Sequence, residues 1–242
     1  MSQVVLYDLP STPPKASWSL NPWKTRMALN FKGVDYRTDW IEYPDLAPKL
    51  KSFGLPPNDR NAPGVSADYS SPAIRFADDT LMMDSWNIIF ELEKRYPEPS
   101  LHLDDPIVLQ VRDLIAVVRD PLMTLTLPKV PDILPERSAQ YFYDTRKVRF
   151  GMPLSDYYKS KSVEQCWEEV KAPAKQFVDL LNSKDGGPFF LGETLSYADF
   201  IFVAFLHFLK RVEVDVFERF LSLDNSFSAI YEASSEWLKK DD

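Results

Sequence analysis

The sequence predicts an α+β protein of two domains, a mixed domain of strands and helices followed by an all-helical domain. Short β-prone runs alternate with helical patterns in the order βαβαββα within residues 1–96. The remaining chain has no convincing strand, and apolar residues recur there at helical spacing. Proline and acidic residues cluster between the two patterns, at residues 97–105. We therefore expect one domain at residues 1–96 and a second at residues 106–242.

The elements of the N-terminal domain follow from local signals. Four strands are expected, at residues 4–7, 36–41, 73–76 and 81–83. Three helices are expected, at residues 22–32, 46–53 and 85–96. Asn21 suits the N-cap of the first helix, because Pro22 then occupies the first helical position, where its missing N–H costs nothing. Gly33 suits the end of that helix, and Asp84 with Ser85 opens the third.

Five helices are expected in the C-terminal domain. Asp105 can cap the first, which begins at Pro106 and keeps helical spacing of its apolar residues. The others are expected at residues 136–149, at 164–182, from 196 onward and at 226–238, with prolines breaking the chain at 128–135. Pro173 is expected to kink or interrupt the third of the five.

The clearest local signal in the C-terminal domain is the segment at residues 195–200. Ser196 and Asp199 have the spacing of a capping box, in which each side chain bonds the backbone of the other. Apolar residues flank them at the positions of a hydrophobic staple. The segment therefore predicts a well-capped, buried helix, and these residues are given no catalytic role.

Composition and charge exclude several classes of function. The net charge is −8 and the basic residues do not form runs, which argues against nucleic-acid binding. One cysteine, Cys166, excludes an internal disulfide, and His102 and His207 lie too far apart to suggest a metal site. The start lacks a signal-peptide pattern, and the longest apolar stretch, residues 200–209, is too short to span a bilayer. We expect a soluble cytoplasmic protein with neither a metal nor a membrane partner.

Three places in the sequence can carry chemistry. Ser17 and Ser19 lie in the loop before the first helix, where a serine hydroxyl can donate to a bound thiolate. Asp84 and Ser85 open a helix, and the free N–H groups of a helix N-terminus favour an anionic group. Ser71–Pro72 precedes a β-prone run, where a proline belongs at the start or the edge of a strand. From the residues alone, ordinary turn and capping roles are favoured at all three places.

Taken together, these segments resemble one known family. The topology is similar to a thioredoxin-like domain followed by helices, and four segments resemble those of glutathione transferases in order and spacing. They are residues 18–29 (WSLNPWKTRMAL), 71–74 (SPAI), 84–89 (DSWNII) and 191–199 (LGETLSYAD). Within that family, residues 21–37 look most like the bacterial lignin β-etherases and their fungal etherase-like (FuA) relatives. The resemblance covers nearly the whole chain.

The resemblance selects between the two serines. Serine-type members have their active serine seven positions before an arginine, and Ser19 precedes Arg26 by seven. This resemblance favours Ser19 over Ser17 as the residue that activates the thiol. Leu20 stands where many members have a proline, so Ser17 remains the second candidate.

The resemblance also implies the residues that bind glutathione. Pro72 matches the family's cis-proline, and the backbone of Ser71 is then expected to meet the cysteinyl part. Asp84 and Ser85 match the pair that binds the γ-glutamyl end. The candidates for the glycyl carboxylate are Lys49, Lys51 and Arg60.

The function that the resemblance implies is transfer of glutathione to hydrophobic, mainly aromatic, electrophiles. A hydrogen bond to a charged group contributes roughly 1.5–3 kcal/mol, and one pKa unit is worth about 1.36 kcal/mol. One serine can therefore lower the thiol pKa by about one to two units. A binder of aromatic small molecules with weak turnover, a ligandin, is the alternative, since 6 Trp, 11 Tyr and 16 Phe can line such a pocket. A third hypothesis is that the protein is a regulatory or structural relative that has the fold but catalyses no reaction.

The resemblance also implies a homodimer, in which the N-terminal domain of one subunit pairs with the helical domain of the other. The helix that begins at Pro106 carries a stripe of apolar residues, but Val108 and Val117 lie away from that stripe. The additional apolar area can be buried by a partner subunit or by residues 128–160 of the same chain.

Overall fold

The computed structural model describes residues 3–61, 65 and 67–242, so part of the chain between the expected helix at 46–53 and the expected strand at 73–76 lies outside the described residues. A four-stranded sheet has the order β2-β1-β3-β4. Its strands are β1 (Val4–Asp8), β2 (Tyr36–Trp40), β3 (Ala73–Arg75) and β4 (Leu81–Met83). β1 pairs parallel with β2 and antiparallel with β3, and β3 forms an antiparallel hairpin with β4. This thioredoxin-like arrangement confirms the predicted fold of the N-terminal part.

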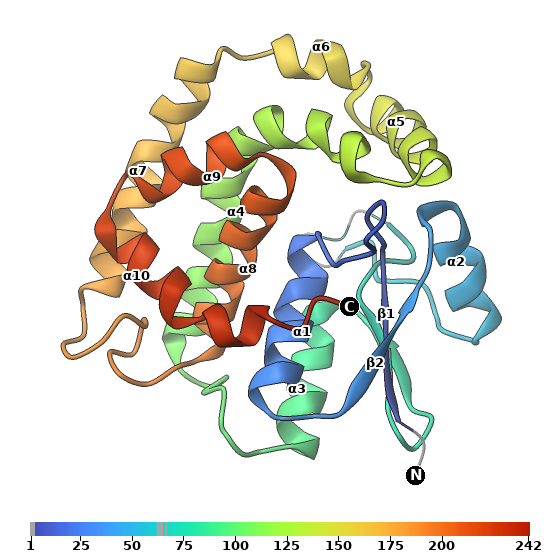
Figure 1. Ribbon diagram of the computed structural model, residues 1–242, viewed down its shortest axis with the longest axis horizontal. Coiled ribbons are helices and arrows are strands. Elements are labelled where there is room, and N and C mark those ends of the chain that lie inside the picture. Colours follow the sequence, from blue (N-terminus) through green and yellow to red (C-terminus); the bar gives the residue numbers. More distant parts are fainter. Residues whose placement is uncertain (1–2, 62–64, 66) are drawn as a thin grey trace.

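Three helices cover the sheet. They are α1 (Leu20–Phe31), α2 (Tyr43–Ser52) and α3 (Ser85–Arg95). α1 and α3 lie on the face turned toward the rest of the molecule, and α2 lies on the other side (Figure 1). All five residues of β1 are buried, because helices cover the sheet on both faces.

The remaining chain is helical. Its elements are α4 (Pro106–Thr126), η1 (Leu127–Ile133), α5 (Glu136–Phe150), α6 (Leu154–Lys159), α7 (Val163–Leu181), α8 (Tyr197–Val212), α9 (Val214–Leu221), α10 (Asn225–Ala233) and η2 (Ser235–Leu238). α8 is the central helix and packs against α1, α4 and α9. It is apolar on nearly all sides, and 13 of its 16 residues are buried. No helix among the described residues has the length and apolarity needed to cross a membrane.

Capping chemistry places three helix starts as predicted. The Asp84 and Asp105 carboxylates accept the N–H groups of Trp86 and Ile107 at the starts of α3 and α4. Before α8, the Asp199 carboxylate accepts the backbone N–H of Ser196 at 2.7 Å. These starts depend on side chains within three residues of the helix, which is why the sequence predicts them.

Other helix boundaries differ from the prediction. α1 begins at Leu20 with Ser19 as its N-cap, so the assignment of Asn21 as N-cap was wrong. Pro22 is the third residue of α1 and is tolerated there because the first four N–H groups of a helix have no partner within it. α7 continues unbroken through Pro173, which is buried in its packed face. Residues 127–133 form a 3₁₀ helix where only chain breaks were expected, and α6 and α9 were not predicted.

Candidate functional site

A cleft of about 800 Å³ opens between the sheet part of the molecule and α5. Ser19 and Asn21 line it from the start of α1, and Tyr43 lines it from α2. The loop before β3 contributes Ser71, and α5 contributes Tyr141. The cleft therefore joins the loop that holds the predicted serines to a helix far away in sequence.

The two candidate serines have different surroundings. Ser17 is fully buried, and its hydroxyl donates to Oδ2 of Asp8 at 2.7 Å. Ser19 is partly exposed, lines the cleft and makes no side-chain capping bond at the start of α1. The backbone of Ser19 is extended and its carbonyl accepts the N–H of Trp23, so the hydroxyl stands at the N-terminus of the helix. A negative charge is favoured at that place.

The Ser71–Pro72 peptide bond is cis, as predicted. Pro72 is buried, and its carbonyl oxygen accepts the backbone N–H of Asp84 at 3.2 Å. Ser71 lines the cleft, whereas Pro72, Asp84 and Ser85 are not among its lining residues. Two segments that the sequence singled out separately are therefore hydrogen-bonded neighbours.

Asp84 and Ser85 stand at the N-terminus of α3. Asp84 adopts a positive φ of 75° and its carboxylate accepts the N–H of Trp86 at 3.2 Å, while Ser85 is buried. Burial lowers the pKa of Lys24 to about 8, against the opposing effect of the Asp84 carboxylate. The Asp84 carboxylate thus has both a capping role and a neighbouring cation.

Of the three basic residues that are candidates to bind the glycyl carboxylate, one lines the cleft. Arg60 lines it, and its Nε donates to the Asp68 carboxylate at 2.6 Å. Lys51 is exposed, and the Lys49 ammonium lies 5.2 Å from the centre of the Phe53 ring. Thus Arg60 is among the residues that line the cleft, whereas Lys49 and Lys51 are not.

The α5 wall of the cleft was not identified from the sequence. Arg146 and Arg149 line it three residues apart, a spacing that places both on one face of a helix. Burial and the charges of Arg146 and Arg119 lower the pKa of Arg149. The Tyr43 ring stacks on Tyr141 at 5.9 Å between centres, and burial raises the pKa of Tyr43. The helix was predicted, but the face that it turns toward α2 depends on contacts about a hundred residues apart in sequence.

Two family models match the chain. Residues 18–95 match "Glutathione S-transferase, N-terminal domain", and residues 111–237 match "Glutathione S-transferase, C-terminal domain". The "Glutathione S-transferase-like protein ustS" of Aspergillus flavus is 33% identical over 257 residues, covering 98% of this chain and 92% of that protein.

Solved structures agree with these matches over the whole length of both chains. Glutathione transferase GSTFuA2 from Phanerochaete chrysosporium has 27% sequence identity and a TM-score of 0.87, with 100% of each chain covered. The glutathione S-transferase CsGST63524 of Ceriporiopsis subvermispora, solved in complex with glutathione, has 28% identity and a TM-score of 0.85, again with 100% of each chain covered. The relatives thus include one in which glutathione is present.

Proposed function

Because this chain belongs to the glutathione S-transferase family, we propose that it joins the sulfur of glutathione to hydrophobic, aromatic electrophiles, with the Ser19 hydroxyl stabilising the thiolate. The thiolate attacks an electrophilic carbon, a carbon–sulfur bond forms, and the leaving group departs with its electron pair. Ser19 donates a hydrogen bond and forms no covalent bond itself. Glutathione is the co-substrate, and no metal takes part in this scheme.

The observation that supports Ser19 is the contrast between the two serines. The Ser17 hydroxyl proton is already engaged by Asp8, whereas Ser19 lines the cleft at the N-terminus of α1. A hydroxyl donor and a helix N-terminus both favour an anion at the same point. Together they lower the pKa of a bound thiol, so that thiolate predominates near neutral pH.

The remaining contacts to glutathione follow from the neighbours of Ser19. We assign the backbone of Ser71, beside the cis bond to Pro72, to the cysteinyl part. Asp84 and Ser85 at the start of α3 are assigned to the γ-glutamyl end, where the carboxylate pairs with the ammonium and the helix N-terminus meets the carboxylate. Arg60 is the basic candidate that lines the cleft, and we assign it to the glycyl carboxylate.

The electrophile is assigned to the α5 side of the cleft. Tyr141 and Val148 line the cleft from α5, and Leu9, Tyr43 and Tyr69 line it from the sheet part. Aromatic side chains favour an aromatic partner through stacked and edge-to-face contacts. We therefore assign the glutathione site to residues 1–96 and one wall of the electrophile site to residues 106–242. On this proposal the protein is an etherase-like transferase that acts in the cytoplasm.

Replacement of Ser19 tests the proposed function. In Ser19→Ala, kcat is expected to fall roughly 10- to 100-fold, because the hydrogen bond to the thiolate is lost. Glutathione affinity is expected to survive, since the other contacts remain. Equilibrium binding and steady-state kinetics with several aromatic electrophiles measure both quantities. Unchanged turnover in Ser19→Ala together with a loss in Ser17→Ala would move the thiol-activating role to Ser17.

A ligandin function is the second candidate. The cleft presents exposed apolar side chains, among them Tyr141 and Val148, which can hold an aromatic compound without reaction. Displacement of a fluorescent aromatic ligand, measured beside turnover, separates the two functions. Tight displacement with negligible turnover toward every electrophile supports the ligandin.

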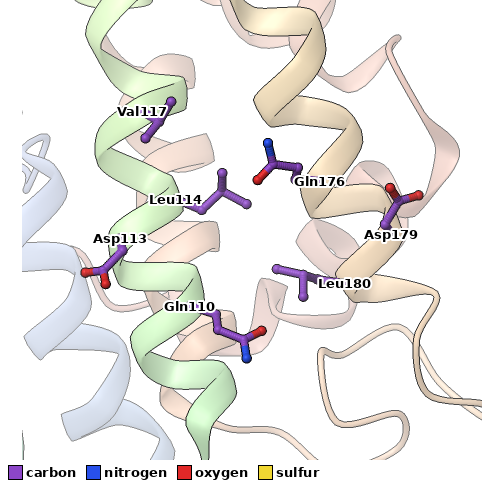
Figure 2. A pocket seen from close by; sticks show the side chains of 7 residues that line it. All are labelled: Gln110, Asp113, Leu114, Val117, Gln176, Asp179 and Leu180. Atoms are coloured by element: carbon purple, nitrogen blue, oxygen red, sulfur yellow. The ribbon is translucent and has the colours of Figure 1, made fainter.

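We also propose a homodimer that uses α4 and α7. Val108 is buried inside the same chain, so it gives no support to a partner interface, contrary to the sequence argument. Val117 is 57% exposed and Leu109 is 47% exposed. Leu114, Val117 and Leu180 line an outward groove of about 570 Å³ between the two helices (Figure 2). Since Val117 is not covered by residues 128–160, a second subunit is the better candidate to cover it.

A further inference from the structure

Residues 237–242 comprise the end of η2 and the chain that follows it, which runs toward α1 and the sheet part of the molecule (Figure 1). The Asn30 side chain of α1 donates to the carbonyl oxygen of Trp237 at 2.7 Å. The Lys240 ammonium donates to the carbonyl oxygen of Tyr36 in β2, also at 2.7 Å. Residues 237–242, the C-terminal strap, are thus attached to both α1 and β2.

The C-terminal strap also reaches the loop that precedes Ser19. The backbone N–H of Ser17 donates to the carbonyl oxygen of Asp241 at 2.9 Å. The carbonyl oxygen of Ser17 accepts the indole N–H of Trp23 at 3.2 Å, and its hydroxyl donates to Asp8 at 2.7 Å. The backbone N–H, the carbonyl and the hydroxyl of Ser17 are therefore all engaged, two residues before Ser19.

Asp8 and Arg26 form a buried ion pair next to the loop that precedes α1. Both side chains are fully buried, and their charged groups meet at 3.2 Å. The other carboxylate oxygen of Asp8 accepts the backbone N–H of Leu9 at 2.7 Å and lies 3.4 Å from the Ser71 hydroxyl. One carboxylate thus contacts both ends of the loop that carries Ser19 and the segment at the cis bond.

The C-terminal strap supplies one of the acceptors of the Arg26 guanidinium. Nη1 of Arg26 donates to the backbone oxygen of Asp242 at 2.8 Å, and Nη2 donates to the Thr38 hydroxyl at 3.0 Å. Thr38 itself donates to the same Asp242 oxygen at 2.6 Å. A buried guanidinium needs acceptors for its N–H groups, and for Nη1 the strap supplies a closer one than the Tyr36 hydroxyl of β2, which lies at 3.4 Å.

We propose that Asp8, Arg26 and the C-terminal strap are positioning elements that hold the 17–19 loop so that the Ser19 hydroxyl meets the glutathione sulfur. This inference rests on the proposed role of Ser19. The backbone N–H, the carbonyl and the hydroxyl of Ser17 are all hydrogen-bonded, so the backbone two residues before Ser19 is restrained. A misplacement of about 1 Å in a reacting group can lower a rate about 100-fold. The strap therefore acts on turnover through Ser19 rather than on the affinity for glutathione.

The test combines removal of residues 239–242 with Ser19→Ala in a double-mutant cycle. Removal of the four residues is expected to lower kcat about 10-fold and to leave the KM for glutathione within about twofold, because an interaction of the reacting state is lost. In the Ser19→Ala background, the same removal is expected to change kcat by less than about twofold. Lys239→Ala is the matched control, since the Lys239 side chain is exposed in the same segment.

Each outcome decides the proposal. Equal losses of kcat in the presence and absence of Ser19 indicate a merely structural role and overturn it, as does unchanged turnover after the removal. If Ser19→Ala alone has no effect, the serine assignment fails and the positioning role fails with it. Thr38→Val removes two of the bonds to Asp242 and Arg26 without shortening the chain, so it replaces the deletion in the cycle if the shortened protein does not fold.

Discussion

Ser17 and Ser19 lie two residues apart in one loop, and their surroundings separate their roles. The buried Ser17 hydroxyl is engaged by Asp8, and the partly exposed Ser19 hydroxyl lies on the cleft. The sequence contained both candidates and the spacing to Arg26 favoured one of them, but only the fold reveals the partner of Ser17. Asp8 was not a predicted site residue, because in the sequence it is simply the residue that follows the first β-prone run.

At the same scale, Asp84→Asn separates the charge of Asp84 from its capping role. Asparagine caps helices as well as aspartate and tolerates a positive φ, so the free energy of unfolding is expected to stay nearly unchanged. Loss of the carboxylate removes the partner of the γ-glutamyl ammonium, and the KM for glutathione is expected to rise about 10-fold or more. Steady-state kinetics with glutathione as the varied substrate measure the effect.

Asp79→Asn is the matched control for this change. Asp79 also has a positive φ, of 65°, and is exposed in the hairpin between β3 and β4. Its replacement is expected to leave the KM for glutathione unchanged. An equal KM in Asp84→Asn and the wild type would contradict the assignment of Asp84.

At the scale of helices and strands, the boundaries that nearby side chains determine were predicted from the sequence. Features that depend on tertiary packing were not. Asp84, Asp105 and Ser196 mark helix starts that depend on side chains within three residues, and these starts were confirmed. α6 and α9 have only six and eight residues, too few for a periodic pattern to be distinguished from a loop. α7 passes through Pro173 because its buried face packs along α4, a contact that the local sequence does not contain.

α8 contains a histidine whose titration is expected to affect stability. Burial, with the nearby charges of Arg211 and Lys210, lowers the pKa of His207 from 6.5 to about 3. Its ring lies against Trp23, and its Nδ1 is 2.8 Å from the Tyr231 hydroxyl. Below pH 6.5 the unfolded chain binds a proton that the folded protein rejects, so the stability that His207 contributes at neutral pH is lost as the pH falls.

The His207→Gln variant tests this titration. Between pH 6.5 and the folded pKa, His207 is expected to add a slope of about 1.4 kcal/mol per pH unit to the free energy of unfolding of the wild type. The variant lacks this slope, and all other titrating groups are shared. Denaturant unfolding at a series of pH values from 7 to about 4.5 measures both curves. Parallel curves would show that His207 has the same affinity for protons in both states.

At the scale of the whole molecule, the site is a product of contacts between distant segments. Tyr43 of α2 stacks on Tyr141 of α5, and the Arg137 guanidinium binds the Asp45 carboxylate with bonds of 3.0 and 3.1 Å. These contacts place α5 over the loop that holds Ser19. The motifs predicted the side of the cleft that we propose for glutathione, whereas the side proposed for the electrophile depends on the packing of α5 on α2.

The proposed dimer gives a prediction at this scale. Sedimentation equilibrium at micromolar concentration is expected to show twice the chain mass of 27.9 kDa. Val117→Lys places a charge in the groove between α4 and α7 and is expected to shift the equilibrium toward monomer. Val214→Lys is the matched control, because Val214 is also about half exposed but lies on α9. A monomer at all concentrations would reject the dimer.

We propose that glutathione binds with its sulfur beside Ser19, in the cleft between the sheet part of the molecule and α5. A crystal structure of this protein soaked with glutathione tests it most directly. We expect the sulfur within hydrogen-bond reach of Ser19 Oγ, the γ-glutamyl end at Asp84 and Ser85, and the Ser17 hydroxyl still bound to Asp8. A sulfur that contacts Ser17, or that lies away from both serines, would contradict the proposed role of Ser19.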